Sequence, residues 1–422
     1  MSRTTGSYRS ITVGGETVRA FLPVPLPPRN PPLHIEGPLE AAHGQALAAL
    51  GRLAVAGAMV PSANWFLYGF VRKEAVLTSQ IEGTQATLED VLTYEATRQA
   101  ERPADVEEVC NYVEALACAR AEVAKPKGLP LCTRLLSAAH ARLMRGVRGA
   151  DKRPGTVRTS QNWIGGDRPG TARFVPPPPD AVPEAMGALE RWIHRPEPLP
   201  PLVRAGLAHV QFETIHPFLD GNGRVGRLLI ALLVEYWSLL PAPLLYLSVA
   251  FKRHRPEYYR RLSAVRTEGD WEGWTAFFLA CVREAAEDGV AAARRLFACI
   301  GDDRRAIMGH AATTLPAVRL FDLLPEHPVV TLPTAMEMLD TSKPTAAKAI
   351  DALGRAGVLR EITGKRRDRV YAYRKYLGIL AEDTDVPARP ARRQERFDES
   401  LRRVHERFGG AKRRLAKGDE GK

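Results

Sequence analysis

The sequence predicts a mostly α-helical protein of two or three domains. Its 422 residues are too many for one ordinary core. Long stretches without proline or glycine keep a helical apolar pattern between residues 39 and 98, and the apolar run 228–234 reads as a buried helix. Strand-like runs are confined to two short regions, near residues 155–176 and on either side of residue 364. We therefore expect the core to be helical and the strands to lie outside it.

The N-terminal 38 residues predict an extended arm, because proline is frequent there, fixes φ and removes backbone donors. The first residues lack the apolar stretch of a secretory signal, and no segment offers about eighteen uninterrupted apolar residues. We expect a cytoplasmic protein without a membrane partner. The five cysteines lack C-x-x-C spacing and predict small buried residues in a reducing compartment: Cys110, Cys118, Cys132, Cys281 and Cys299.

The segment from His216 to Arg227, His-Pro-Phe-Leu-Asp-Gly-Asn-Gly-Arg-Val-Gly-Arg, combines more kinds of chemistry than any other. A glycine turn that opens a helix brings backbone N–H groups to a helix N-terminus, where phosphate binds readily. Arg224 and Arg227 could reach the same polyphosphate, and Asp220 is a suitable ligand for Mg²⁺. Histidine suits a general base near neutral pH. The segment predicts a site that holds a nucleotide and deprotonates an acceptor.

A dinucleotide-binding turn is one alternative for this segment. Gly221, Gly223 and Gly226 satisfy the G-x-G-x-x-G pattern. That pattern must follow a strand, whereas residues 202–215 look helical and no βαβ rhythm surrounds them. The structural context of a dinucleotide site is therefore missing.

A metal site and a plain turn are two further alternatives. His209, Glu213 and His216 share one helical face and could hold a structural zinc ion. That reading leaves the Gly-Asn-Gly-Arg half of the segment unexplained. An ordinary glycine turn between helices would not account for Asp, Asn and Arg side chains converging at one place.

The segment resembles the signature of the Fic family, H-x-F-x-[D/E]-G-N-G-R-x-x-R, and matches it at every defined position. Most Fic proteins of this kind transfer the AMP group of ATP to a hydroxyl side chain of a target protein. The resemblance covers roughly residues 40–375 and implies a Fic-type helical core with a β-hairpin flap. It also implies ATP as substrate and Mg²⁺ as cofactor.

The resemblance assigns a role to each matching residue. His216 would deprotonate the acceptor hydroxyl, Asp220 would hold Mg²⁺, and Phe218 would pack inward to anchor the loop. Asn222 would contact the α-phosphate, while the two arginines would bind the β- and γ-phosphates. The implied ATP-binding residues are Gly221, Asn222, Gly223, Arg224, Gly226, Arg227 and Tyr258.

The assignment of Tyr258 rests on the segment around residues 256–271, which is similar to the region that lines the adenine pocket in the family. Tyr258 is the tyrosine that we expect to contact the base. Either Tyr258 or Tyr259 could instead be a core aromatic residue.

A helix N-terminal to the signature carries a second motif of the family. Thr78, Glu82 and Gly83 fit the inhibitory pattern [S/T]-x-x-x-E-[G/N]. A glutamate inserted into the pocket would pair with Arg227 and exclude the γ-phosphate. The alternative is a helix that ends at glycine with a solvent-facing glutamate.

The chain loses helical character between residues 151 and 179. Two short strands, over 155–166 and 171–176, are predicted around a Gly/Asp/Pro loop. They resemble the flap with which the family holds a target segment by strand addition. The alternative is a surface hairpin without function, which would expose apolar side chains for no purpose. The predicted docking residues are Gln161, Asn162, Trp163 and Ile164.

The C-terminal part resembles a winged helix-turn-helix, with residues 342–353 as the recognition helix. A net charge of +12 permits DNA binding without establishing it, because much of the excess lies in the wing and the tail. A protein-binding or dimerisation module of the same fold is the alternative. The residues expected at DNA are Lys343, Thr345, Lys348, Arg366, Arg367 and Arg369.

The predicted function is an autoinhibited protein adenylyltransferase that acts on Ser, Thr or Tyr of another protein or of itself. The alternatives are a DNA-binding regulator whose core senses nucleotide, and a Fic enzyme that uses another nucleotide or removes AMP. The sequence leaves open whether the protein forms a homodimer. The expected parts are an arm and inhibitory region (1–105), a catalytic domain (106–290), a linker helix (291–312), a winged helix (313–378) and a basic tail (379–422).

Overall fold

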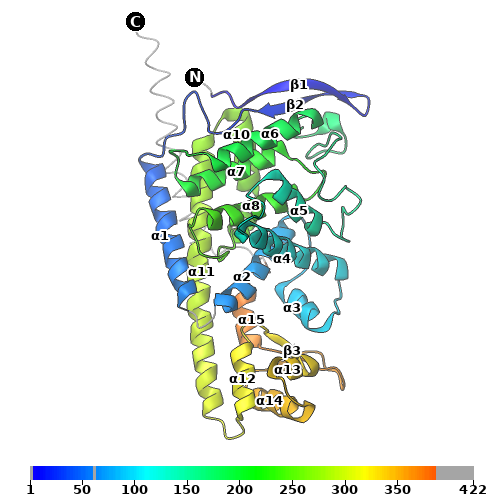
Figure 1. Ribbon diagram of the computed structural model, residues 1–422, viewed down its shortest axis with the longest axis vertical. Helices are drawn as coiled ribbons and strands as arrows, with labels where there is room; N and C mark the ends of the chain where they lie inside the picture. The colour runs from blue at the N-terminus through cyan, green and yellow to red at the C-terminus, as the bar shows by residue number, and fades with distance from the viewer. Residues whose placement is uncertain (1–2, 60–62, 386–422) are drawn as a thin grey trace.

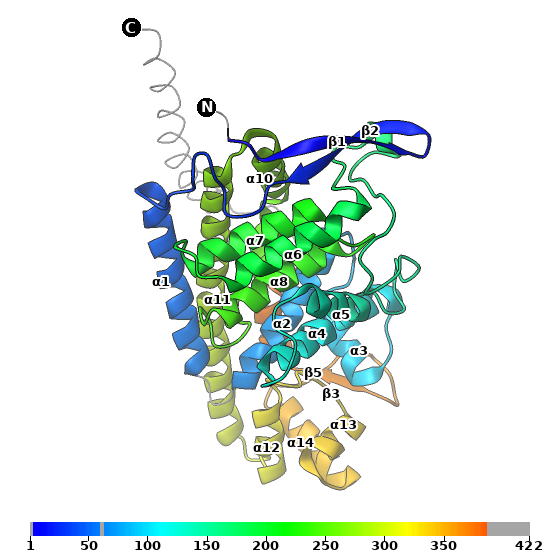
Figure 2. The same cartoon turned by 45° about the horizontal axis from the view of Figure 1, so that its top comes forward.

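One long helix, α11 (Trp271–Met308), runs through the molecule and connects its two ends (Figure 1). Helix α1 (Pro38–Ala58) lies alongside it in both views (Figure 2). The computed structural model describes residues 3–59 and 63–385. The prediction of a mostly helical protein is confirmed.

The body of the molecule is built around α7 (Pro201–Ile215) and α8 (Asn222–Tyr236), which pack against each other and are buried along most of their length. Their apolar side chains belong to one continuous core, which fixes the short loop between the two helices. The other elements of the body are α2 (Ala63–Ile81), α3 (Leu88–Thr97), α4 (Pro103–Ala124), α5 (Thr133–Leu143), η1 (Pro169–Thr171), η2 (Pro179–Ala181), α6 (Val182–His194), α9 (Ser248–Arg253) and α10 (Arg255–Glu268).

The N-terminal segment is not simply an extended arm. Strands β1 (Gly6–Val13) and β2 (Glu16–Pro23) form an antiparallel hairpin that projects over the body (Figure 1). Gly14 and Gly15 both have positive φ, 57° and 82°, as a two-residue hairpin turn requires. The prolines begin only at Pro23, the last residue of β2, so the expectation of a proline-rich extended arm was wrong for residues 6–22.

The predicted flap strands are also wrong in extent. Residues 155–176 contain a single antiparallel bridge, between Ile164 and Phe174, and the turn η1 lies between these two residues. Pro169 and the run of prolines from residue 176 to 179 supply no backbone donors, so a longer ladder cannot form. The segment is instead held by β2, since the Phe21 N–H donates to Val175 O at 2.9 Å.

The predicted linker at residues 291–312 is mostly the second half of α11, which crosses residue 290 without a break. The stretch contains no proline; Gly301 lies inside the helix without interrupting it, and Gly309 caps its end. The catalytic and linker regions therefore share one rigid element.

A smaller unit follows at the far end of α11, where α12, α13 and α14 are grouped (Figure 2), and its last helix, α15, packs back against α2, α3 and α11. Its three-stranded antiparallel sheet has the strand order β3-β5-β4. Three short helices precede the strands β4 and β5, as expected, whereas β3 was not expected; the assignment as a winged helix-turn-helix stays a prediction. The elements are α12 (Leu315–Leu323), β3 (Val329–Thr331), α13 (Leu332–Leu339), α14 (Lys343–Arg355), β4 (Arg360–Glu361), β5 (Val370–Ala372) and α15 (Arg374–Ala381).

Three smaller predictions can be compared with the structure. Most of the basic tail, residues 386–422, lies outside the described residues, and its first part forms the end of α15. All five cysteines are free thiols, but Cys118 is exposed, and Cys110 and Cys299 are half-buried, so the expectation of uniformly buried residues was wrong. No helix within the described part of the chain is long and apolar enough to cross a membrane.

Candidate functional site

The motif segment forms the loop between α7 and α8. Helix α7 ends at Ile215 and is capped by His216, whose backbone is left-handed with φ 52°; Gly221, with φ 75°, precedes the first residue of α8. A left-handed conformation is unfavourable for a residue with a side chain, so surrounding contacts must hold His216 in place. The loop brings the histidine beside the N-terminus of α8, where free backbone N–H groups can bind an anion.

Asn222 closes this loop from the inside. Its Oδ1 accepts a hydrogen bond from the Phe218 N–H at 2.9 Å, and its Nδ2 donates to Phe218 O at 2.8 Å. The Asn222 side chain is buried, and Phe218 itself packs inward as expected. Because both ends of the amide hold the loop, a contact of this side chain with an α-phosphate stays a prediction.

Arg158 supports the loop from the outside and was missed by sequence reasoning. It is 2% exposed, and its Nε donates to His216 O at 2.9 Å. Its Nη2 donates to Pro177 O at 2.6 Å and to Ile215 O at 3.4 Å. The guanidinium thus satisfies the last carbonyls of α7 and joins them to the flap segment. No periodic pattern distinguishes this arginine from the other arginines of the chain.

His140 on α5 is a second support that the sequence did not reveal. The Gly155 N–H donates to its Nδ1 at 2.8 Å, which leaves the Nε2–H of the neutral ring to donate to Asp220 O at 3.0 Å. The ring stacks on Phe218 with centroids 3.9 Å apart. Burial lowers the pKa of His140 to about 4, so the ring is neutral at pH 7 and this tautomer is maintained.

His216 is placed as a neutral base. Its pKa is lowered to about 4, first by burial and then by the positive charge of Arg158; Glu82 acts in the opposite direction. The neutral imidazole therefore predominates at pH 7 and can accept a proton. Nδ1 lies 3.4 Å from Glu213 O, which favours the tautomer with the hydrogen on Nδ1 and a free lone pair on Nε2.

The predicted inhibitory residues meet the second arginine of the motif. Arg227 Nη2 lies 2.6 Å from Glu82 Oε1, and its Nε donates to Thr78 Oγ1 at 2.5 Å. The Arg227 side chain is 2% exposed and that of Glu82 is 31% exposed. Burial by itself would raise the pKa of Glu82, but the charge of Arg227 outweighs it and the net pKa is lowered. Gly83 follows with a positive φ of 101° and ends the helix there.

Glu82 also occupies the space in front of the glycine turn. A Cβ added to Gly223 would lie 2.3 Å from Glu82 Oε1 and 3.1 Å from Arg227 Nη1. The carboxylate therefore lies against the backbone at the start of α8, where an anion would bind. Gly226, in contrast, packs inward: a Cβ there would lie 2.4 Å from Glu213 Oε1.

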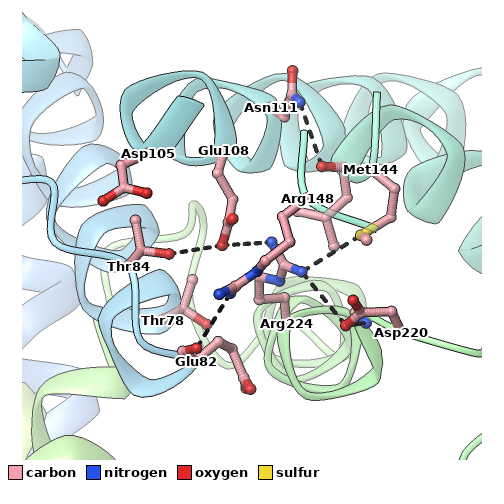
Figure 3. A network of polar contacts seen from close by, with 12 residues as sticks. Thr78, Glu82, Thr84, Asp105, Glu108, Asn111, Met144, Arg148, Asp220 and Arg224 are labelled. Carbon is pink, nitrogen blue, oxygen red and sulfur yellow. Dashed lines mark hydrogen bonds and ion pairs between the residues drawn. The ribbon is translucent and has the colours of Figure 1, made fainter. Parts of the chain in front are cut away.

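The first arginine of the motif has a different partner, which sequence reasoning also missed. Arg224 Nη1 lies 2.7 Å from Glu108 Oε1 on α4, and both side chains are almost fully buried, at 2% and 4% exposure. Its Nη2 contacts Met144 Sδ at 3.5 Å and lies 4.0 Å from Asp220 Oδ1 (Figure 3). Nothing in the sequence around Glu108 distinguishes it from other glutamates on a helix face.

Asp220 fits the predicted role of a Mg²⁺ ligand. Its side chain is 44% exposed, and its Oδ1 accepts a hydrogen bond from the Gly221 N–H at 2.6 Å. A carboxylate held at the anion-binding turn and open to solvent suits a cation that also binds phosphate oxygens. The described residues contain no cluster of three or more metal-binding side chains, so the phosphates would have to supply further ligands.

The zinc alternative is contradicted by the structure. His209 is fully buried, and its Nε2 lies 2.8 Å from the hydroxyl oxygen of Tyr258. The dinucleotide-binding alternative fails as well, because the residues before the glycines form helix α7 and not a strand.

Tyr258 lies in the core, 1% exposed, and stacks on Phe251 with ring centroids 4.6 Å apart. This position favours the alternative in which Tyr258 is a core aromatic residue, and Tyr259, 44% exposed, is the tyrosine at the surface. Contact of Tyr258 with an adenine base stays a prediction.

The four predicted docking residues lie next to the loop. Asn162 Nδ2 donates to Phe218 O at 3.1 Å, and Gln161 Nε2 donates to Pro176 O at 3.0 Å. Trp163 packs partly into a small apolar cluster beneath the hairpin β1-β2, while Ile164 is 37% exposed. The inner half of the segment is thus fixed to the catalytic loop, and its outer half faces solvent.

Comparison with family models and solved structures agrees with this geometry. Residues 41–121 match the N-terminal region of the Fic/DOC family, and residues 130–234 match the Fic/DOC family itself. A solved structure of a Fic family protein from Desulfovibrio desulfuricans is 22% identical, with a TM-score of 0.53. It covers 82% of this chain and 98% of its own, and at this identity it supports the fold alone.

Two curated relatives carry an activity in their names. A probable protein adenylyltransferase of Aquifex aeolicus is 41% identical over 96 residues, which are 22% of this chain and 26% of the relative. The protein adenylyltransferase Fic of Drosophila yakuba is 32% identical over 135 residues, 32% of this chain and 24% of the relative. The similarity thus spans about a quarter of the length of these relatives.

Proposed function

We propose that this chain, which belongs to the Fic/DOC family, transfers AMP from ATP to the hydroxyl of a Ser, Thr or Tyr side chain on a target protein. The observation that carries the proposal is the placement of His216 on the short loop that leads from α7 into α8, with the two motif arginines in the first turns of that helix. A base, an anion site and cationic groups for a triphosphate are thereby gathered on one short loop.

The chemistry follows from the residues of the loop. The Nε2 lone pair of His216 would take the proton of the acceptor hydroxyl as its oxygen attacks the α-phosphorus. The new oxygen–phosphorus bond forms while the bond from the α-phosphorus to the bridging oxygen breaks, and pyrophosphate leaves. Backbone N–H groups at Gly221–Gly223 would stabilise the charge that develops on the α-phosphate oxygens. Mg²⁺ held by Asp220 would neutralise phosphate charge.

Glu82 is proposed to inhibit this reaction. Its ion pair with Arg227 uses a guanidinium that the γ-phosphate would need, and its carboxylate lies against Gly223. Removing one partner of a buried pair typically costs about 3–5 kcal/mol, and about 1.4 kcal/mol is a factor of ten in binding. Because Glu82 is partly exposed, we expect its ion pair with Arg227 to weaken productive ATP binding about a hundredfold.

The exposed edge at Ile164 is proposed to dock an extended segment of the target. The segment would add as a short strand beside the single bridge between Ile164 and Phe174, and the inner half of the flap segment is fixed to the loop that carries His216. The docked segment could belong to another protein or to this chain, so self-modification belongs to the same proposal.

The test compares AMP transfer from ATP labelled on the α-phosphate, with Mg²⁺, by wild type and by Glu82→Gly. We expect the variant to incorporate about a hundredfold more label into target protein or into itself. Glu82→Gly combined with His216→Ala is the control and should incorporate none.

Two results would contradict the proposal: label that persists without His216, or a Glu82→Gly protein no more active than wild type. Parallel reactions with other labelled nucleotides, and with a protein that already carries AMP, test the alternatives of another nucleotide and of AMP removal.

A second candidate function is DNA binding by the C-terminal unit. One observation favours it: basic side chains on α14 and on the loop between β4 and β5 are exposed and form no ion pair among the described residues. They are Lys343, Lys348, Arg366, Arg367 and Arg369. A positive surface of this kind suits phosphate contacts without sequence readout.

A further inference from the structure

The two motif arginines are each paired with a glutamate from the N-terminal helices, but the pairs differ in burial. In the Arg227–Glu82 pair the glutamate is 31% exposed, whereas in the Arg224–Glu108 pair it is 4% exposed. A carboxylate at the surface can be displaced into solvent when a phosphate arrives. A carboxylate inside the core cannot, because it would remain as an unpaired buried charge. Glu108 therefore stays with Arg224 whether or not nucleotide is bound.

Glu108 also holds the loop that follows the inhibitory helix (Figure 3). Its Oε1, the atom that pairs with Arg224, accepts a hydrogen bond from Thr84 Oγ1 at 2.8 Å. Thr84 is 3% exposed and stands two residues after Glu82. The next residue, Gln85, donates its backbone N–H to Asp105 Oδ2 at 2.9 Å, one turn earlier on α4. One face of α4 thus anchors the end of the inhibitory segment.

Arg224 still has hydrogen-bonding capacity after these contacts. Its buried Nε and Nη1 have no hydrogen-bond acceptor among the residues that the structure describes, so the contact of Nη1 with Glu108 is an ion pair only. Its Nη2 has only the thioether of Met144 at 3.5 Å and Asp220 Oδ1 at 4.0 Å. A buried donor without a strong acceptor is unfavourable, so this guanidinium is suited to an incoming anion on the side of Asp220.

We propose that Glu108 is a positioning residue with two effects: it orients Arg224 toward the nucleotide phosphates, and through Thr84 it holds Glu82 in the inhibitory position. The inference rests on the proposed nucleotide site. It makes the Arg224–Glu108 pair a permanent part of that site and the Arg227–Glu82 pair the element that opens. It also links the two pairs, since Thr84 and Glu82 belong to the same short segment.

Two substitutions separate the two effects. Glu108→Gln keeps the size of the side chain and an oxygen that can accept from Thr84, but removes the charge that orients Arg224. Thr84→Val keeps the shape of the threonine and removes only the hydroxyl, so the Arg224–Glu108 pair is left intact. Each is made in full-length wild type and in Glu82→Gly, and ATP affinity is measured by calorimetry with Mg²⁺ beside AMP transfer.

In the Glu82→Gly background, Glu108→Gln should weaken ATP binding about 10- to 100-fold, the scale known for partners that orient ligand-binding side chains. Thr84→Val should leave ATP affinity within about twofold there, because no inhibitory carboxylate remains to be held. In wild type, Thr84→Val should raise AMP transfer about 2- to 10-fold, the scale of one hydrogen bond.

Glu108→Asp is the matched control: it retains the charge and should recover part of the lost affinity. A role in folding alone would lower the melting temperature without changing the dissociation constant for ATP. Unchanged affinity in Glu108→Gln would overturn the orienting effect, and unchanged activity of Thr84→Val in wild type would overturn the link to Glu82. If Glu82→Gly itself binds no ATP, the proposed function fails instead, which is a distinct result.

Discussion

The loop between α7 and α8 with the first turns of α8, and the predicted wing between β4 and β5, are both short segments that contain glycine and arginine, yet their arginines have opposite surroundings. Arg224 and Arg227 are buried, and each has a defined carboxylate partner. Arg366 and Arg367, on the wing between β4 and β5, are exposed and form no ion pair among the described residues. The same kind of side chain is thus buried and paired in one region and exposed in the other.

The difference teaches how each region should respond to change. A buried charge depends strongly on its partner, because desolvation penalises it when that partner is lost. An exposed charge acts through its long-range field, which salt screens and which adds up over neighbouring groups. Substitutions in the loop should have large and specific effects, and substitutions in the wing should have small, salt-dependent ones.

Arg227→Ala in the Glu82→Gly background should give the largest effect. It removes the guanidinium proposed for the γ-phosphate, and AMP transfer should fall about 10²- to 10³-fold, as is typical for a group that stabilises charge in the reacting complex. Arg366→Ala in the same background is the control and should change transfer less than about twofold. Equal losses in the two variants would remove the distinction between buried and exposed arginines.

Arg158→Gln should have an intermediate effect that depends on pH. With the pKa of His216 lowered to about 4, kcat/KM of Glu82→Gly should stay level down to about pH 5 and fall only as the imidazole becomes protonated. Removing the positive charge of Arg158 should raise that pKa and move the acid limb of the kcat/KM profile to higher pH. If the shift is about one unit, the rate at pH 5 falls about twofold, and the full loss of about tenfold is reached only well below pH 4.

Arg158→Lys keeps the charge and should leave the acid limb of the kcat/KM profile at the pH seen with Arg158. NMR titration of the His216 ring measures the same pKa shift without turnover. Glu213, whose pKa burial raises to about 7, is present in all these variants and so does not affect the comparison. An acid limb at the same pH for Gln and Lys would show that the charge of Arg158 does not act on His216.

Arg366→Ala combined with Arg367→Ala should give the smallest effect on catalysis and a graded effect on DNA. If both arginines contact phosphates, the salt dependence of duplex binding should decrease by about 0.9 per lost contact, and AMP transfer should be unchanged. Gel shifts at several salt concentrations measure this slope. A duplex affinity and slope equal to those of wild type would exclude the wing from DNA binding and favour the protein-binding alternative.

The residues of the site could be predicted where one short segment carries them. His216, Asp220, Arg224 and Arg227 lie within twelve residues, and their spacing identified the loop and the helix that follows. Glu82 was predicted from a second motif, and the structure brings it to Arg227. The supports of the loop could not be found in this way. His140 contacts Asp220 across 80 residues of chain, and such a pairing depends on how α5 packs against the loop.

The strands were predicted less well than the helices, for two different reasons. The N-terminal hairpin had a signal in Gly14-Gly15, which the proline-rich stretch from Pro23 onward concealed. The flap was overestimated because its apolar alternation resembles strands, while the prolines near it prevent a ladder of more than one bridge. In both cases the availability of backbone donors decided the outcome.

The sequence by itself determined the chemistry of the loop: which groups can accept a proton, bind an anion or hold a cation, because those properties belong to the side chains and to the glycine backbone. Only the tertiary structure decided the state of each group. It gave Arg227 a partner that solvent can reach and Arg224 one that solvent cannot, and it kept His216 neutral by burying it beside Arg158. Burial and distance set these states, and both arise from helices that are far apart in the chain.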